Sequence, residues 1–303
     1  MAIILGENRY GKAENRVFRV TRTGDIHEVL DLNVSVQLSG DFDDTHTVGD
    51  NANVLPTDTQ KNTVFALSHQ HGAMEPEAFG LIIARHFITS QPHITKAEVR
   101  IEKFHWDRIV SQGSPHPHAF QRNGSMTRTA TVLLCRNAES TREFVVSGLE
   151  NLVVLKTTGS EFTGYLRDQY TTLAETTDRI MATQVSARWR IAATDAPTLD
   201  GMNWAKIFRE SLDAMLTAFA EHHSLSLQQT LFTMGECVLS DAPAIAAIRI
   251  SLPNKHHFAV DLTPFGRDNR NEVFIAADRP YGLIEAVIER DDTPPMTDVW
   301  PSW

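Results

Sequence analysis

Asn254 and His256 stand two residues apart in the stretch S-L-P-N-K-H-H-F, which begins at Ser251. A histidine titrates near neutral pH and can pass a proton in either direction, while a side-chain amide can both donate and accept hydrogen bonds. Together these side chains suit a site that holds a small polar molecule and moves protons to or from it. A hydrogen-bonded core histidine would explain the same residue, so both interpretations stay open at this point.

Two predicted strands must position this pair. Apolar residues recur at every second position on both sides of it, namely Ile248, Ile250 and Leu252 before it and Phe258, Val260 and Leu262 after it. Pro253 and Asn254 interrupt the alternation and predict a corner between the strands. Counting by twos back from Phe258 puts His256 on the apolar face and His257 on the polar face. We therefore expect His256 to point inward.

Thr57 opens the run T-D-T-Q-K-N-T, and Gln60 follows three residues later. This is the form of a capping box, and Val64, Phe65 and Leu67 supply the apolar stripe of a short helix. The pattern predicts Thr57 as the helix N-cap. A helix N-terminus also attracts anions, so a binding role for Thr57 is compatible with the cap.

Phe162, Arg179 and Gln228 are further candidates for a functional site, but each has an ordinary structural explanation. Phe162 could belong to the core. Arg179 could cap the C-terminal end of a helix, because the apolar residues around it are in helical phase, namely Leu166, Tyr170, Leu173 and Ile180. Gln228 could be a first-turn residue of the next helix. None of the three is decisive alone.

The remaining elements repeat one order. The first half predicts strands near 17–21 and 30–38, helices from 57 and over 76–87, and strands near 99–106 and 129–135. The second half predicts strands near 144–146 and 152–155, the helix before Arg179, a strand near 187–191, helices over 204–219 and 227–238, and the strand pair at 248–262. This indicates an α+β fold of two similar tandem units, residues 1–137 and 138–303.

Composition restricts the class of protein. The chain has 303 residues, 42% of them hydrophobic and 22% charged, which is ordinary for a globular enzyme. A formal net charge of -10 argues against nucleic-acid and anionic-membrane partners, because both select basic surfaces. Cys135 and Cys237 are isolated, so no disulfide framework is expected. With no secretory pattern and no S-K-L-type C-terminus, we expect a cytoplasmic protein.

Five separated motifs stand out along the chain: R-Y-G-K from Arg9, T-D-T-Q-K-N-T from Thr57, F-T-G-Y-L-R-D-Q-Y-T-T-L-A-E-T-T-D-R from Phe162, S-L-S-L-Q from Ser224, and S-L-P-N-K-H from Ser251. They resemble motifs of the urate oxidase (uricase) family, in the family's order and with similar spacing. The similarity extends from about Arg9 to Ile284. It implies two tandem tunnelling-fold units, each an antiparallel four-stranded sheet with helices on one face.

The resemblance also implies a role for each candidate residue. Phe162 would stack on the flat purine, while Arg179 and Gln228 would hold the ring edge in its plane, and the backbone amide of Leu227 would add a donor.

The opposite edge of the purine would meet Thr57 and Asp58 of a neighbouring subunit, with Lys12 behind Thr57. Lys12 would act as a base through the Thr57 hydroxyl, and Asn254 and His256 would lie above the ring, where oxygen and water bind.

By this resemblance, the chain would oxidise urate with O2 to 5-hydroxyisourate and hydrogen peroxide. No G-x-G-x-x-G follows a predicted strand, and the resemblance implies an oxidase without a metal or organic cofactor. It further implies a homotetramer whose sites lie between subunits. No nucleic-acid or membrane partner is expected.

Two alternative functions stay open. A metal-dependent relative of the same fold would use histidine pairs, which are His69 with His71, His116 with His118, and His256 with His257, although H-E-x-x-H is absent. A purine-binding oligomer without catalysis is the second, and intact Lys12, Thr57 and His256 favour activity over it.

Some positions depart from the family pattern. Leu227 stands where many members have valine, and Thr163 and Thr177 stand where some have tryptophan, so packing beside the clamp is expected to differ. The tail from Asp291 has no family counterpart. Trp300 and Trp303 would either dock on a neighbouring subunit or belong to a disordered tail.

Overall fold

The alternating run from Leu30 to Leu38 forms the second strand of an antiparallel sheet in the computed structural model, which describes residues 2–293, 296, 299 and 300. Contacts divide the chain into two compact units. Unit 1 comprises Met1–Gly148, Arg190–Lys206 and Pro294–Trp303, and unit 2 comprises Leu149–Trp189 and Ile207–Thr293. Two strands, β5 (Thr141–Lys156) and β6 (Met181–Ile191), each run from one unit into the other along the chain.

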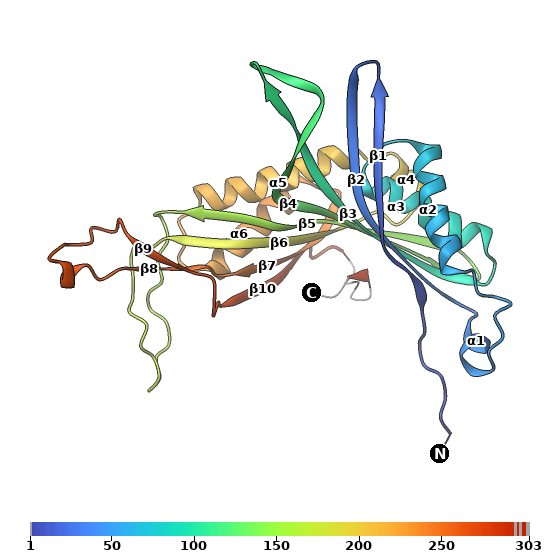
Figure 1. Cartoon of the computed structure of the whole chain (residues 1–303). Helices are drawn as coiled ribbons and strands as arrows, with labels where there is room; N and C mark the ends of the chain where they lie inside the picture. Colours follow the sequence, from blue (N-terminus) through green and yellow to red (C-terminus); the bar gives the residue numbers. More distant parts are fainter. Residues whose placement is uncertain (1, 294–295, 297–298, 301–303) are drawn as a thin grey trace. The chain divides into compact units, whose positions relative to one another are not determined.

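Unit 1 contains an antiparallel sheet in the order β1, β2, β3, β4 and the first part of β5 (Figure 1). The bounds are β1 Tyr10–Thr23, β2 Ile26–Gly40, β3 Ile94–Ser111 and β4 Ser114–Arg136. Val36, Val99 and Val132 lie opposite one another on three adjacent strands and are fully buried. Such cross-strand rows of β-branched side chains fix the register, because a slip of one residue would turn them to the other face.

Helices cover this apolar face of unit 1. The bounds are α1 Asp43–Thr47, α2 Thr57–His71, α3 Pro76–Ser90 and α4 Ala196–Asp200. The longer helices pack on the sheet, α2 against β1 and α3 against β3 and β4 (Figure 1). The predicted helix over 76–87 is confirmed, and its apolar residues Phe79, Ile83 and Phe87 are buried.

Unit 2 contains the second part of β5, then β6, β7 (Ile245–Pro253) and β10 (Leu283–Glu289). Most of α5 (Trp204–Glu221) belongs to this unit, and α6 (Leu227–Asp241) packs against β7 and β10. Two short strands, β8 (His256–Ala259) and β9 (Phe274–Ala277), pair separately, with the 3-10 helix η1 (Thr263–Phe265) between them. The predicted buried face of β7 is confirmed, since Ile248, Ile250 and Leu252 have no exposed surface.

The predicted fold class, α+β with two tunnelling-fold units, is therefore confirmed. Each set of four strands, β1 to β4 and β5, β6, β7 and β10, has a pair of longer helices inserted between its second and third strands. The tandem division at residues 137 and 138 stays a prediction: β4 ends at Arg136 and β5 begins at Thr141, whereas the contact-based units divide later, inside β5.

The prediction of a helix in the segment that leads to Arg179 is wrong. Residues 157–180 form an irregular segment, and the side chains that gave the helical period face solvent, Leu166 being 96% and Tyr170 79% exposed. Asp168 accepts hydrogen bonds through its Oδ1 from the backbone N–H of Tyr170 and the hydroxyl of Thr171. Such local side-chain bonds favour a turn, and an apolar period produces a helix only where a partner surface buries it.

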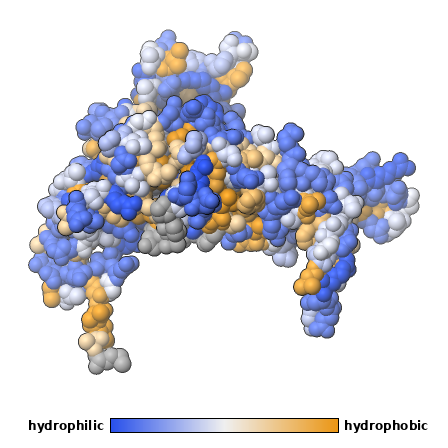
Figure 2. Space-filling model, turned by 180° about the vertical axis from the view of Figure 1, so that it is seen from behind, coloured by the Kyte–Doolittle hydropathy of each residue, from blue (hydrophilic) through white to orange (hydrophobic). Residues whose placement is uncertain are grey.

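The tail from Asp291 returns to unit 1 in the part that the structure describes. Val299 is buried against Leu133, Phe144 and Val146, and Met296 and Trp300 pack against the same cluster. Trp303 lies outside the described residues. At the other end of the chain, the N-terminal segment exposes Ile3 and Ile4 and forms the apolar projection at the lower left of Figure 2.

A buried ionic network joins α3 to the sheet of unit 1. Arg128 on β4 donates through Nη2 to both carboxylate oxygens of Glu77, at 3.0 and 2.8 Å, and through Nη1 to Glu75 at 2.7 Å. Ser147 on β5 donates to Glu77 Oε1 at 2.7 Å. Glu77 is only 1% exposed, so its charge depends on these donors.

Replacing Glu77 by alanine should therefore destabilise the protein by about 3–5 kcal/mol, because the buried guanidinium of Arg128 loses its main partner. Urea unfolding measures the change. Glu221→Ala on the exposed side of α5 is the control and should stay within about 0.5 kcal/mol of the parent. A Glu77→Ala chain as stable as the control would contradict the prediction.

Candidate functional site

Two segments of unit 2 that are far apart in sequence pair through their backbones. Glu161 donates its N–H to the carbonyl of Ser224 at 2.8 Å, and Ser224 donates to the carbonyl of Gly159 at 2.9 Å. Ser160 and Ser224 are both fully buried at this pairing. As a result, the segment that carries Phe162 is fixed next to the start of α6.

Arg179 lies on the same support. Its N–H donates to the Ser160 carbonyl at 2.8 Å, and its Nε donates to the Ser160 Oγ at 3.3 Å. The guanidinium carbon lies 5.3 Å from the centre of the Phe162 ring. Burial lowers the pKa of Arg179, and no carboxylate pairs with it among the residues that the structure describes. A partly buried cation without an acidic partner is a mark of an anion site.

Helix α6 directs its first turn to the same side of the pairing. Ser226 is the N-cap, and its Oγ accepts from the N–H of Gln229 at 3.1 Å, as expected for a serine at this position. Leu227 and Gln228 follow as the first helical residues, whose N–H groups have no partner within a helix. Leu227 is buried and Gln228 is exposed, so the former anchors the helix while the amide of the latter is free to contact a ligand.

Asn254 lies at the end of β7, where the predicted corner is found. Its N–H donates to the carbonyl of Gly282 at 2.8 Å, and it forms an isolated bridge with Thr183 on β6. Since β6 begins at Met181, two residues after Arg179, the backbone of Asn254 is tied close to the strand that follows Arg179.

The period-two placement of His256 is confirmed, but the inward direction is wrong in this chain. Its ring stacks on Phe258, with centroids 5.6 Å apart and an interplanar angle of 21°, so the two residues share a face. Phe258 is nevertheless 52% exposed, and His256 and His257 are both partly exposed. The alternation predicted the face correctly. It could not predict that a short strand outside the main sheet lacks a core to cover that face.

Unit 1 brings the other three candidates together. Thr57 and Asp58 are the first residues of α2. A hydrogen bond from Lys61 and the charge of Lys61 lower the pKa of Asp58, and the charge of Lys12 on β1 adds a smaller contribution in the same direction. Lys12 precedes a bulge in β1, where Asn15 donates through Nδ2 to the Lys12 carbonyl at 3.3 Å.

The prediction that Thr57 is the N-cap is wrong by one residue. Pro56 is the N-cap, and no side chain caps the helix. Gln60 does not complete a capping box either, because its Nε2 lies 3.5 Å from the carbonyl of Leu55. The fixed φ of proline is compatible with the entry into a helix, so the helix begins directly after it. The Thr57 hydroxyl is consequently not used for capping.

Sequence analysis missed the supporting role of Ser160 and the contact between Phe162 and Tyr165, whose rings stack 4.9 Å apart. The only signal was position, since Tyr165 stands within the motif that begins at Phe162 and Ser160 lies two residues before it. Small or aromatic residues inside a motif do not reveal which neighbour they touch until the backbone pairing is known.

Neither a metal centre nor a membrane segment emerges from the described residues. No group of three or more His, Cys, Asp or Glu side chains in that part of the chain could hold a metal ion. Likewise, no helix there is long and apolar enough to cross a membrane.

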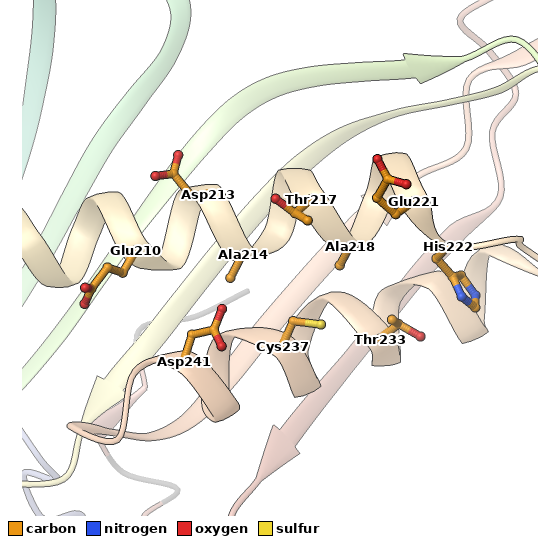
Figure 3. Close-up of a pocket in the computed structure, with 10 residues that line it drawn as sticks. All are labelled: Glu210, Asp213, Ala214, Thr217, Ala218, Glu221, His222, Thr233, Cys237 and Asp241. Carbon is orange, nitrogen blue, oxygen red and sulfur yellow. The ribbon is translucent and has the colours of Figure 1, made fainter.

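A groove of about 690 Å³ between α5 and α6 contains none of the predicted site residues (Figure 3). Figure 3 shows acidic side chains along it, including Glu210, Asp213 and Asp241.

Comparison with known proteins identifies the family to which the chain is similar. A sequence model of the family described as Uricase matches residues 8–133 and 145–285. The chain belongs to the uricase family. The family and the enzyme class predicted from the motifs, urate oxidase, are thereby confirmed.

Individual members of the uricase family match almost the whole chain. The uricase of Arthrobacter globiformis is 49% identical over 298 residues, covering 98% of this chain and 94% of the relative. The uricase of Aspergillus flavus is 37% identical over 297 residues, covering 93% and 95%. The crystal structure of the Arthrobacter globiformis uricase superposes with a TM-score of 0.91 and covers 99% of both chains.

An unpaired buried cation should cost this uricase-family chain stability when no ligand is bound. Arg179→Gln should therefore raise the free energy of unfolding of the ligand-free protein by about 0.5–2 kcal/mol. Thermal unfolding measures it. The matched control is Arg188→Gln, which removes a paired arginine whose Nη2 donates to Glu150 at 2.7 Å, and should destabilise. Equal losses of stability in both variants would show that Arg179 has a stabilising partner after all.

Proposed function

We propose that the chain oxidises urate with O2 and water to 5-hydroxyisourate and hydrogen peroxide, without a metal or organic cofactor. The observation that carries this proposal is Arg179, a partly buried guanidinium beside the face of Phe162 with no acidic partner among the described side chains. Urate is flat, anionic and edged with carbonyl oxygens. The aromatic face of Phe162 matches the flat ring, the guanidinium fork matches the negative charge, and the N–H groups at the start of α6 match the carbonyl oxygens.

The binding half of the site would come from unit 2. Arg179 would donate to the carbonyl oxygens and deprotonated ring nitrogen at one edge of the purine, and Phe162 would stack on its face. The backbone N–H of Leu227 and the side-chain amide of Gln228 would complete the same edge. All four are supported by the pairing at Ser160 and Ser224, so a rigid backbone feature would hold the contacts in one plane.

The proton-transfer half would come from Lys12, Thr57 and Asp58 of a neighbouring copy of the chain. Lys12 would take a proton from bound urate through the Thr57 hydroxyl, which helix capping does not use. Asp58 would contact the edge of the purine opposite Arg179. A homotetramer with sites between subunits is part of the proposal, on the strength of the resemblance to the uricase family.

The reaction balances with O2 as the only oxidant. Urate gives two electrons to O2, water adds a hydroxyl group to the purine, and the reduced oxygen leaves as hydrogen peroxide. Asn254 would hold the oxygen and then the water above the ring, and His256 would move protons to the reduced oxygen. An electron-rich substrate that supplies both electrons, and a sequence without a G-x-G-x-x-G fingerprint, support the absence of a cofactor. A cytoplasmic setting belongs to the same proposal and agrees with two free cysteines.

The direct test is urate consumption. The purified chain in air should remove the ultraviolet absorbance of urate and release hydrogen peroxide in a one-to-one ratio, and Arg179→Ala should lower kcat/KM by at least about a hundredfold because it removes a charged contact. Peroxide detection separates oxidation from binding alone. A folded parent that binds urate but forms no peroxide would favour the non-catalytic purine-binding alternative.

Metal independence has its own test. Incubation with a strong chelator, followed by desalting, should leave the rate of urate loss unchanged, because no step of the proposed reaction passes through a metal. Metal content is measured by mass spectrometry on the same sample. A rate that falls after chelation and returns with an added divalent ion would overturn this part of the proposal.

Mixed assembly tests the shared site. Thr57→Ala and Arg179→Ala chains, each inactive alone, are unfolded together in equal amounts and reassembled. If the site takes these residues from different copies, about one quarter of the sites should contain both intact residues and recover activity. Mixing either variant with itself is the control. Mixtures as inactive as the controls would place both residues in one copy.

A further inference from the structure

Tyr165 faces Phe162 directly. The centres of the two rings are 4.9 Å apart, and the rings are nearly parallel, at 12°. Gly164 makes this possible because its φ of 68° is in the left-handed region, which turns the chain between the two aromatic residues. The N–H of Gly164 donates to Glu175 Oε1 at 3.1 Å, which fixes the turn to the returning part of the segment.

Tyr165 is held by its own segment. Its hydroxyl donates to the carbonyl of Leu173 at 2.6 Å, and the guanidinium carbon of Arg167 lies 5.2 Å from the centre of its ring. Arg167 in turn lies 3.9 Å from Glu175. The tyrosine ring therefore has a defined position, although the segment has neither helix nor main-sheet strand to support it.

The ring of Phe162 depends on this contact. Its backbone is fixed by two hydrogen bonds with Thr176, at 2.8 and 3.2 Å, but backbone bonds do not set the plane of a side-chain ring. A flat ring has two faces, and Tyr165 covers one of them. A flat ligand can stack only on the other face, and its tilt is set by the plane in which Tyr165 holds Phe162.

We propose that Tyr165 is a positioning residue: by stacking on one face of the Phe162 ring, it fixes the plane in which a flat oxopurine lies on the other. This rests on the proposed function for the identity of the ligand. It assigns the selectivity for flat rings to a pair of aromatic residues, with Phe162 touching the ligand and Tyr165 acting through Phe162.

The test compares Tyr165→Ala, which removes the stack, with Tyr165→Phe, which keeps the stack and removes only the hydroxyl bond to Leu173. Urate binding is measured under nitrogen by calorimetry, where no turnover occurs, and kinetics are measured in air. Tyr165→Ala should weaken binding and raise KM by about two- to tenfold, in keeping with the loss of one aromatic contact. Its kcat should stay within about threefold of the parent, because stacking acts on bound urate and the transition state alike.

Tyr165→Phe should bind urate within about twofold of the parent, since its ring still stacks. Tyr170→Ala is the matched control, because Tyr170 belongs to the same segment and is 79% exposed. If Tyr165→Ala does not fold by circular dichroism, Tyr165→Leu replaces it, with bulk retained and no flat face.

If Tyr165→Phe binds urate as weakly as Tyr165→Ala does, the stacking proposal is overturned in favour of the hydroxyl bond to Leu173. If the parent consumes urate and Tyr165→Ala binds urate as tightly as the parent does, this proposal is overturned and the proposed function is not. A parent that neither binds nor consumes urate would overturn the proposed function and this proposal with it.

Discussion

Backbone pairing between Gly159, Glu161 and Ser224 is the constraint on which the candidate site depends. It joins an irregular segment to the first turn of α6, and its two hydrogen bonds are inaccessible to water because Ser160 and Ser224 are fully buried. Ser160 then holds Arg179 through both its carbonyl and its hydroxyl. One pairing thus determines where an aromatic ring, a guanidinium and a helix N-terminus converge.

The same site of unit 2 gathers positive charge. Among the described residues no carboxylate pairs with the partly buried guanidinium of Arg179, which keeps a hydrogen bond to Ser160, and the first N–H groups of α6 have no acceptor within the helix. Each of these costs folding free energy that a well-packed apolar residue would not cost. A bound anion would satisfy both, so binding and folding stability are linked at this point.

Residue patterns predicted those helices and strands in which one buried face determines the spacing of the apolar residues. The alternation in β2 and β7 and the apolar stripes of α3 and α6 correspond to faces that pack against a sheet or a helix. The stripe of Leu166, Tyr170 and Leu173 has the same spacing but no surface opposite it, and the chain there follows local turns instead. Periodicity cannot distinguish these cases, because it contains no information about what faces the stripe.

The candidate site was predictable to a different degree. The motif resemblance supplied the candidate residues, and the structure brings Phe162 and Arg179 together in unit 2 and Lys12 and Asp58 into electrostatic reach in unit 1. The supports of those residues were not predictable. Ser160 and Tyr165 act through contacts across a turn, and the start of α2 depends on the dihedral angle of Pro56 rather than on the capping pattern after it.

Unit 1 is assembled from pieces of the chain that are synthesised at very different times. Val299 packs onto Leu133, Phe144 and Val146, and the intervening residues that belong to unit 2 leave the ribosome first. Until Val299 is synthesised, the nascent chain exposes this apolar patch, and all residues of unit 2 are made before those of unit 1 are complete. The core of unit 1 is therefore completed only by residues that are synthesised after those of unit 2, and its apolar patch is open to chaperones in the meantime.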